Sequence, residues 1–296
     1  MGQHGESLKK RTQDVLIPED PSEIEPKQTL DTGTPPIRKI SASYDLRQWL
    51  VMGWKDLWSA PQALVHGLVV AAVGLLILAY SWGQPVVSMI WISGFLLVGP
   101  IFAVGVNAMA RRLERGDSKP VGFGLGAIRD LGGALWVYAA VLIILFVLWA
   151  TVVWRWIGVL TLGDLGAPAT MGEVLSVMLA SPQGIVTLLG VIAAGVLFAL
   201  AVFAISVVTL PAMLDRQKGF VDAVAVSFKA FRENAGPLLV WGLIITALFA
   251  ISAATAFIAF IVIFPWLGFA MWHGYRRLVA SEEERARDSK PHPAQG

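Results

Sequence analysis

The membrane architecture of this chain follows from the segment PLLVWGLIITALFAISAATAFIAFIVIFPWLGFAMWHGY, residues 237–275. As one helix it would be about 58 Å long at 1.5 Å per residue, about twice the 30 Å of hydrocarbon in a bilayer. One span would also place the two arginines that follow it outside, although basic residues near spans stay cytoplasmic. Two spans, 237–254 and 256–275, meeting near Ser252–Thr255, satisfy both constraints.

Four further apolar runs precede this segment and are long enough to cross a bilayer. They lie at 62–80, 85–110, 134–154 and 184–214. The composition agrees, because 56% of the residues are apolar and 15% are charged, whereas about a quarter of a soluble domain is charged. We therefore predict an all-α, polytopic membrane helical bundle of six transmembrane helices. They form three hairpins, each preceded by a cytoplasmic amphipathic helix.

The basic residues indicate the orientation of the predicted bundle. Of 23 Lys and Arg residues, only Arg155 falls on the outer side of the spans, and basic residues in short loops are retained in the cytoplasm. Both termini are therefore expected in the cytoplasm. The net charge of +2 provides no broad basic field, so we expect no nucleic-acid partner.

The ends of the chain differ from its apolar middle. Residues 1–36 mix charges of both signs with several prolines, which is typical of a disordered segment. We predict a disordered cytoplasmic tail at 1–36, a six-span membrane domain at 37–280 and a polar cytoplasmic tail at 281–296. The first apolar run begins near Gln62, far from the start, so no cleavable signal peptide is expected.

Two of the three predicted amphipathic helices have a clear apolar stripe, and helices of this kind lie at the membrane surface. Both have apolar residues at helical spacing on one face. The first stripe is Leu46, Trp49, Leu50, Gly53, Trp54, Leu57 and Trp58, and the second is Phe220, Val224, Phe228 and Phe231.

Tryptophans are expected in two interfacial belts, because the amphipathic indole prefers the headgroup level. The cytoplasmic belt would hold Trp49, Trp54, Trp58, Trp136, Trp241 and Trp272, and the outer belt Trp82, Trp149, Trp154 and Trp156.

A threefold internal repeat is indicated by short motifs before each hairpin. They share the order small, large apolar, basic, acidic, and read Gly53-Trp54-Lys55-Asp56, Ala127-Ile128-Arg129-Asp130 and Ala230-Phe231-Arg232-Glu233. The alternative to a true repeat is chance, because every hairpin that ends in the cytoplasm needs basic residues and short similarities then arise without repetition.

Proline spacing favours true repetition. Pro100 lies eleven residues before Arg111 in an Arg-Arg-Leu motif, and Pro265 lies eleven before Arg276 in a second one. Pro211 takes the corresponding place in the middle hairpin, whose basic end is reduced to one arginine. Repeats that run in the same direction predict a pseudo-threefold arrangement about the membrane normal.

These residues resemble a known family. The segments PPIRKI (35–40), GWKDL (53–57), GFLLVGP (94–100) and RRLERG (111–116) are similar to the bacterial integral-membrane family called domain of unknown function 2189. The similarity extends over roughly 36–280. It implies a six-span protein of the bacterial inner membrane and brings no established catalytic residues.

Chemical motifs are absent from the predicted spans. They contain no Asp, Glu, Lys or Arg, which argues against an ion-coupled pump. No zinc-protease, serine-hydrolase or phosphate-loop pattern occurs, and the chain has no Cys. We therefore expect no enzymatic activity, no metal site and no cofactor.

Two histidines are the exception to this absence. His66 and His273 lie near the cytoplasmic ends of the first and last spans, and two facing imidazoles can hold a haem iron. Interfacial hydrogen bonding is the plainer interpretation of both.

A few other positions could either stabilise helix packing or line a cavity. Asn107 could form a hydrogen bond between helices, and Pro100, Pro211 and Pro265 can kink their spans. Three kinked helices could frame a central cavity, with ordinary packing as the alternative.

Three functions remain open from the sequence. The first is a non-enzymatic scaffold or accessory component of a membrane assembly, with membrane lipids and a protein as partners. The second is a passive channel or carrier for an apolar or lipid-like substrate, which requires a cavity lined by Asn107 and the kinks. The third is a haem-binding redox protein.

Overall fold

The computed structural model describes residues 35–117, 125–165, 170–216 and 219–279, with side chains omitted at 125 and 157–165. These residues form helices and no strand. The helices are α2 (Asp45–Ser59), η2 (Pro61–Ala63), α3 (Leu64–Tyr80), α4 (Pro85–Phe102), α5 (Val104–Glu114), α6 (Leu125–Leu165), α7 (Met171–Ala180), α8 (Pro182–Ser206), α9 (Thr209–Arg216), α10 (Phe220–Glu233), α11 (Ala235–Ala254) and α12 (Phe260–Leu278). The predicted tails lie outside the described residues, except for 35–36.

Five helical segments are long and apolar enough to cross a membrane. They are Pro61–Tyr80, Pro85–Glu114, Gly126–Trp156, Pro182–Arg216 and Ala235–Ala254. They match the first five predicted spans to within a few residues, except that the third begins eight residues earlier. The cause is a kink at Gly132, where φ is 48°. A short helix before this kink continues directly into the span, so the two are counted as one segment. Glycine adopts this backbone conformation without a steric penalty.

The sixth predicted span is not among the candidate spans. Its helix, α12, ends in Arg276 and Arg277 after His273, and these polar residues lower its hydropathy. The predicted break between the last two helices is present, since α11 ends at Ala254 and α12 begins at Phe260. Six spans therefore stay a prediction.

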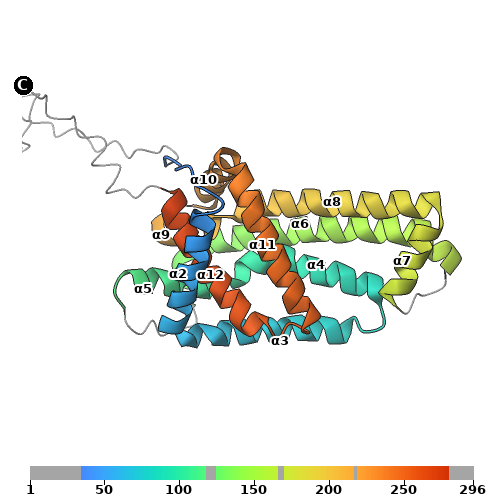
Figure 1. Ribbon diagram of the computed structural model, residues 1–296, viewed down its shortest axis with the longest axis horizontal. Coiled ribbons are helices and arrows are strands. Elements are labelled where there is room, and N and C mark those ends of the chain that lie inside the picture. The colour runs from blue at the N-terminus through green and yellow to red at the C-terminus, as the bar shows by residue number, and fades with distance from the viewer. Residues whose placement is uncertain (1–34, 118–124, 166–169, 217–218, 280–296) are drawn as a thin grey trace, which may run out of the picture. The chain divides into compact units, whose positions relative to one another are not determined.

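The long helices lie side by side along one direction. α3 contacts α4, α4 contacts α6, and α6 contacts α8, while α11 crosses them obliquely (Figure 1). α5, α9 and α12 contact one another near the end where α2 and α10 also pack. This end carries the basic residues of α5, α9 and α12, and we call it the basic end.

The apolar stripe of α2 packs mainly against protein. Leu46, Trp49, Gly53 and Leu57 are buried, and α2 packs mostly against α12. An added Cβ at Gly53 would lie 2.5 Å from the backbone nitrogen of Ala270. This close approach of the two helices explains why position 53 has a residue without a side chain.

The stripe predicted for α10 is not its buried face. The buried residues are Ala223, Val226, Ser227 and Ala230, whereas Phe228 is exposed. Most residues of this face are small, and their size lets α10 pack closely on α8 and α9.

Several tryptophans predicted for the two belts are covered by protein, so they do not face the surroundings of the helices. Trp49, Trp241 and Trp272 are buried in the protein core, and the rings of Trp49 and Trp241 meet edge to face at 5.5 Å. Trp149 is also buried and donates a hydrogen bond to Ser93 at 2.8 Å. The remaining predicted belt residues are exposed, namely Trp54, Trp58, Trp82, Trp136, Trp154 and Trp156.

The chain enters and leaves this helical unit at one place. Ile37 forms an antiparallel bridge with Val279, and the Arg38 amide donates to the Leu278 carbonyl at 2.8 Å. Asn234 fastens the incoming segment further, because its side chain accepts from the Ile40 amide and donates to the Arg38 carbonyl, both at 3.0 Å.

Candidate ligand-binding cavity

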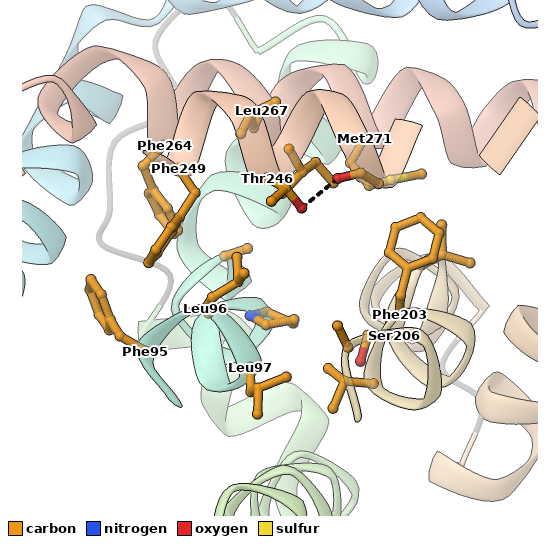
Figure 2. A pocket seen from close by; sticks show the side chains of 18 of the residues that line it. Phe95, Leu96, Leu97, Phe203, Ser206, Thr246, Phe249, Phe264, Leu267 and Met271 are labelled. Atoms are coloured by element: carbon orange, nitrogen blue, oxygen red, sulfur yellow. Dashed lines mark hydrogen bonds between the residues drawn. The ribbon is translucent and has the colours of Figure 1, made fainter. Parts of the chain in front are cut away.

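A cavity of about 800 Å³ lies between α4, α8, α11 and α12. Figure 2 shows Phe95, Leu96 and Leu97 of α4, Phe203 and Ser206 of α8, Thr246 and Phe249 of α11, and Phe264, Leu267 and Met271 of α12 around it. Among its described lining residues, only Asn107, Ser206 and Thr246 have polar side chains, and none is ionisable. Pockets of 300–1,000 Å³ with apolar walls and a few polar groups are typical binding sites for small molecules.

Two helix breaks shape the cavity wall. α4 ends at Phe102 and α5 begins at Val104, with Pro100 in the last turn of α4. α8 ends at Ser206 and α9 begins at Thr209, with Pro211 in the first turn of α9. Proline has no amide hydrogen and opens the helix locally, so both prolines lie where a long span bends around the cavity.

The second break is stabilised from a neighbouring helix. Ser227 of α10 accepts a hydrogen bond from the Val208 amide at 3.3 Å and donates to the Ala204 carbonyl at 2.9 Å. These bonds satisfy buried backbone groups that a regular helix would pair internally.

Five helices, which form three continuous stripes, present residues to the cavity at helical spacing. The stripes are Gly99, Ala103 and Asn107 on α4 and α5, Phe203, Val207 and Pro211 on α8 and α9, and Phe264 and Gly268 on α12. Residues four apart lie on one face of a helix. The cavity therefore follows the three stripes, and the helices at their inner ends, α5, α9 and α12, contact one another at the basic end.

Pro265 takes no part in the lining. The carbonyl of Ile261, four residues earlier, lies against α3, where an added Cβ at Gly67 would be 2.2 Å from its oxygen. Pro265 leaves this carbonyl without its helical donor. Of the four predicted cavity positions, Asn107, Pro100 and Pro211 line the cavity, and Pro265 lies beside the contact of α12 with α3.

Asn107 is the most buried of the polar lining residues. Its side chain is 2% exposed, and Nδ2 donates to the Ala103 carbonyl at 2.9 Å. Oδ1 has no hydrogen-bond partner within the described part of the chain. An unpaired buried acceptor costs about 1–3 kcal/mol, and because Oδ1 has almost no exposed surface, a ligand donor can pair with it only if the Asn107 side chain turns toward the cavity.

Ion pairs join three of the cavity-lining helices at the basic end. Arg276 contacts Asp215 through two nitrogens, at 2.8 and 2.7 Å, and Glu114 at 2.7 Å. The Tyr275 hydroxyl donates to Asp215 at 2.8 Å. We call Glu114, Asp215, Tyr275 and Arg276 the clasp, since they join α5, α9 and α12 one to two turns beyond the cavity lining.

The clasp favours the charged form of its arginine. Burial alone would lower the pKa of Arg276, but the bond to Glu114 and the charge of Asp215 outweigh burial, so this pKa lies above its ordinary value. The guanidinium also lies over the Trp272 ring, 5.2 Å from its centroid, in a cation–π contact.

The two histidines have different neighbours. His273 Nε2 lies 2.7 Å from the Asp56 carboxylate of α2. His66 packs against α5, where an added Cβ at Gly105 would be 2.1 Å from its Nε2. The structure therefore does not arrange these nitrogens as a facing pair of axial ligands.

Sequence reasoning missed the clasp and the two hydroxyls of the lining. A signal for the clasp was present, because Glu114 and Asp215 lie beside the basic ends of two spans. Ser206 and Thr246 carry no such signal, since each is a single small polar residue within a long apolar run.

Comparison with known proteins yields one match. No curated protein and no solved structure is significantly similar to this chain. The family model described as "Predicted integral membrane protein (DUF2189)" matches residues 87–215, which include most of α4, all of α5, α6, α7 and α8, and most of α9. The matched range is narrower than the similarity expected from sequence. Over these residues the chain is similar to the family of predicted integral membrane proteins called DUF2189, so the resemblance inferred from the motifs is confirmed there.

Proposed function

We propose that this membrane protein binds an uncharged, lipid-like molecule in the cavity and acts as a non-enzymatic carrier or binding protein for it. The observation that carries the proposal is the apolar cavity of about 800 Å³ lined by Asn107, Pro100 and Pro211. A tightly packed bundle would have argued against this function. The cavity favours it over the scaffold role that sequence alone suggested first.

The lining supports a neutral ligand with one polar end. Transfer of a charged group into an apolar site without a partner costs many kcal/mol, and the described lining has no ionisable side chain. Asn107 Oδ1 lies toward the basic end of the lining without a partner. A long-chain alcohol or a neutral glyceride fits both features, with its hydroxyl near Asn107.

We place the protein in the bacterial inner membrane with the basic end in the cytoplasm. Arg111, Arg112, Arg216 and Arg276 lie there, and such residues favour the cytoplasmic side. The contact between Ile37 and Val279 supports cytoplasmic positions for the segments on either side of the helical unit. It also implies an even number of membrane crossings.

Photolabelling tests the proposed binding. The probes are a diazirine-bearing long-chain alcohol and the matching fatty acid. The cavity-filling variant is Gly99→Leu, because Gly99 lines the cavity and an added Cβ there meets nothing within 4 Å. Gly236→Leu is the matched control, since Gly236 is also uncrowded but does not line the cavity.

The alcohol should label peptides of α4, α8 and α11 more strongly than the acid does, and Gly99→Leu should reduce this labelling about tenfold, equivalent to about 1.4 kcal/mol. Labelling that is equal in Gly99→Leu and Gly236→Leu would refute the proposal.

A scaffold role is the second candidate. Large apolar side chains are exposed on the two helices that pack at the basic end, with Trp54 and Trp58 on α2 and Val221 and Phe228 on α10. These surfaces could dock a partner helix. For this role, a protein partner should copurify stoichiometrically in mild detergent and be lost on Phe228→Ser substitution.

A further inference from the structure

The places where the chain enters and leaves the helical unit limit the possible number of membrane crossings. Ile37 and Val279 are paired, so the two segments lie on one side of the membrane and the crossings are even in number. Five segments have the length of a span. Either α12 completes a sixth crossing, or α11 turns back before completing its own.

The turn between α11 and α12 lies well short of the outer helix ends. Phe257 in this turn is fully buried, and its ring lies 2.4 Å from an added Cβ at Gly74 of α3. It also packs edge to face on Phe95 of α4, with ring centroids 5.5 Å apart. At 1.5 Å per residue, α3 continues about 9 Å beyond Gly74, and α4 extends about 15 Å outward from Phe95.

The backbone of this turn is paired internally. The amides of residues 255–260 all donate within the turn or to the end of α11, including Phe257 to the Ser252 carbonyl at 2.6 Å and Ala259 to Thr255 Oγ1 at 3.2 Å. Ala256 and Phe257 have positive φ, at 50° and 64°, which is uncommon without glycine. In hydrocarbon, backbone groups must be satisfied without water, and this turn meets that requirement for its amides.

The side chains of the turn also suit lipid. No ionisable residue occurs between Ala235 and Trp272, and Ile258 projects outward with 65% of its surface exposed. The turn between α3 and α4 differs, because it has Gly83 at φ 73° and an exposed Trp82. That turn is built for the interface, whereas Thr255–Ala259 has neither glycine nor an interfacial indole.

We infer that α11 and α12 form a re-entrant hairpin, which enters the bilayer from the basic end and returns to it with its tip, Thr255–Ala259, inside the hydrocarbon. The chain then makes four complete crossings. The hairpin leaves the middle of α8 uncovered, where Ile192 and Val196 line the cavity and are exposed. Resting on the proposed function, this opening is the entrance through which a bilayer lipid reaches the cavity.

Cysteine mapping tests the hairpin, because the chain has no Cys of its own. Single-cysteine variants Ile258→Cys at the tip, Trp82→Cys at the outer turn and Arg115→Cys at the basic end are treated with a membrane-impermeant maleimide. Intact cells and inverted vesicles are compared. Trp82→Cys should react only from outside and Arg115→Cys only from inside. Ile258→Cys should react about tenfold less than either from both sides, because its thiol lies in hydrocarbon.

A spin label at the same three positions provides a second measurement. At residue 258 the label should be accessible to oxygen, which partitions into lipid, and shielded from a water-soluble nickel complex. Maleimide reaction of Ile258→Cys from the side of Trp82→Cys, or nickel accessibility equal to that at residue 82, would establish six crossings and overturn the inference. These readouts do not involve the ligand. Failure of photolabelling would therefore refute the proposed function while leaving the hairpin intact.

Discussion

The basic end of the cavity-lining helices is built differently from the part of the same helices that lines the cavity. At the basic end, α5, α9 and α12 are joined by the ion pairs of Arg276 with Asp215 and Glu114. One to two turns further in, the same helices present Asn107, Pro211 and Met271 to an open cavity. The difference indicates that polar contacts and buried tryptophans hold these helices together at the basic end, whereas the part next to it is open to a ligand. Substitutions at the basic end should therefore reduce stability, and substitutions at the cavity should alter binding.

The largest loss of stability is expected from Gly53→Ala. Its Cβ would lie 2.5 Å from the Ala270 backbone nitrogen, so α2 must move away from α12. Overpacking of this kind typically costs about 1–3 kcal/mol, and a backbone neighbour places it near the upper end. Thermal unfolding in detergent, followed by tryptophan fluorescence, measures the loss. Gly236→Ala is the control, because its Cβ meets nothing; equal effects of the two would contradict the close packing of the basic end.

Removal of the clasp arginine should have the next largest effect. Arg276→Met leaves the largely buried Asp215 carboxylate without its bidentate partner. A fully buried pair would cost 3–5 kcal/mol to break, and partial exposure reduces this to about 2 kcal/mol. The same unfolding assay applies. Arg115→Met removes an exposed charge at the end of α5, beside Glu114, and should change stability by less than about 0.5 kcal/mol.

Filling the cavity should leave stability almost unchanged. Gly99→Leu places its side chain in free space, and leucine favours a helix over glycine by about 0.8 kcal/mol. We expect an unfolding temperature equal to or above that of the natural protein. A loss as large as that of Arg276→Met would show that the lining of α4 is packed rather than open.

The smallest expected effect is the pH-dependent contribution of Asp45 to stability. Burial acts to raise the pKa of Asp45, but the bonds from Arg277 and the Ser41 amide outweigh it, so this pKa lies below its ordinary value. The stability gained from the carboxylate is present above the unfolded-state pKa of about 3.9. It is lost as pH falls through the folded-state pKa.

Asp45→Asn should therefore destabilise the protein by under about 1 kcal/mol at pH 6. The difference from the natural protein should shrink as pH falls below about 4. Unfolding temperatures of the two proteins from pH 3 to 6 measure this trend. A difference that grows toward acid would contradict the ion pair of Asp45 with Arg277.

The apolar spans could be predicted because lipid imposes their length and composition on the sequence. The break after Ala254 followed from the same argument, since one helix would have been about twice as long as a bilayer is thick. The bends at Pro100 and Pro211 were also accessible, because proline acts on its own helix.

Contacts between distant segments could not be predicted in this way. Trp49 and Trp241 resemble interfacial anchors in sequence, but they pack on each other in the core. An indole suits both places, and only the tertiary structure decides between them. The depth of the turn at Phe257 was hidden for the same reason, because it depends on contacts with Gly74 and Phe95.

Native mass spectrometry of the protein released from mild detergent tests the central claim of an open, ligand-binding interior most directly. The natural protein and Gly236→Leu should carry one uncharged, hydroxyl-bearing lipid per chain, and Gly99→Leu should carry it at about a tenth of that occupancy. Equal occupancy in all three proteins, or no bound lipid in the natural protein, would contradict the account.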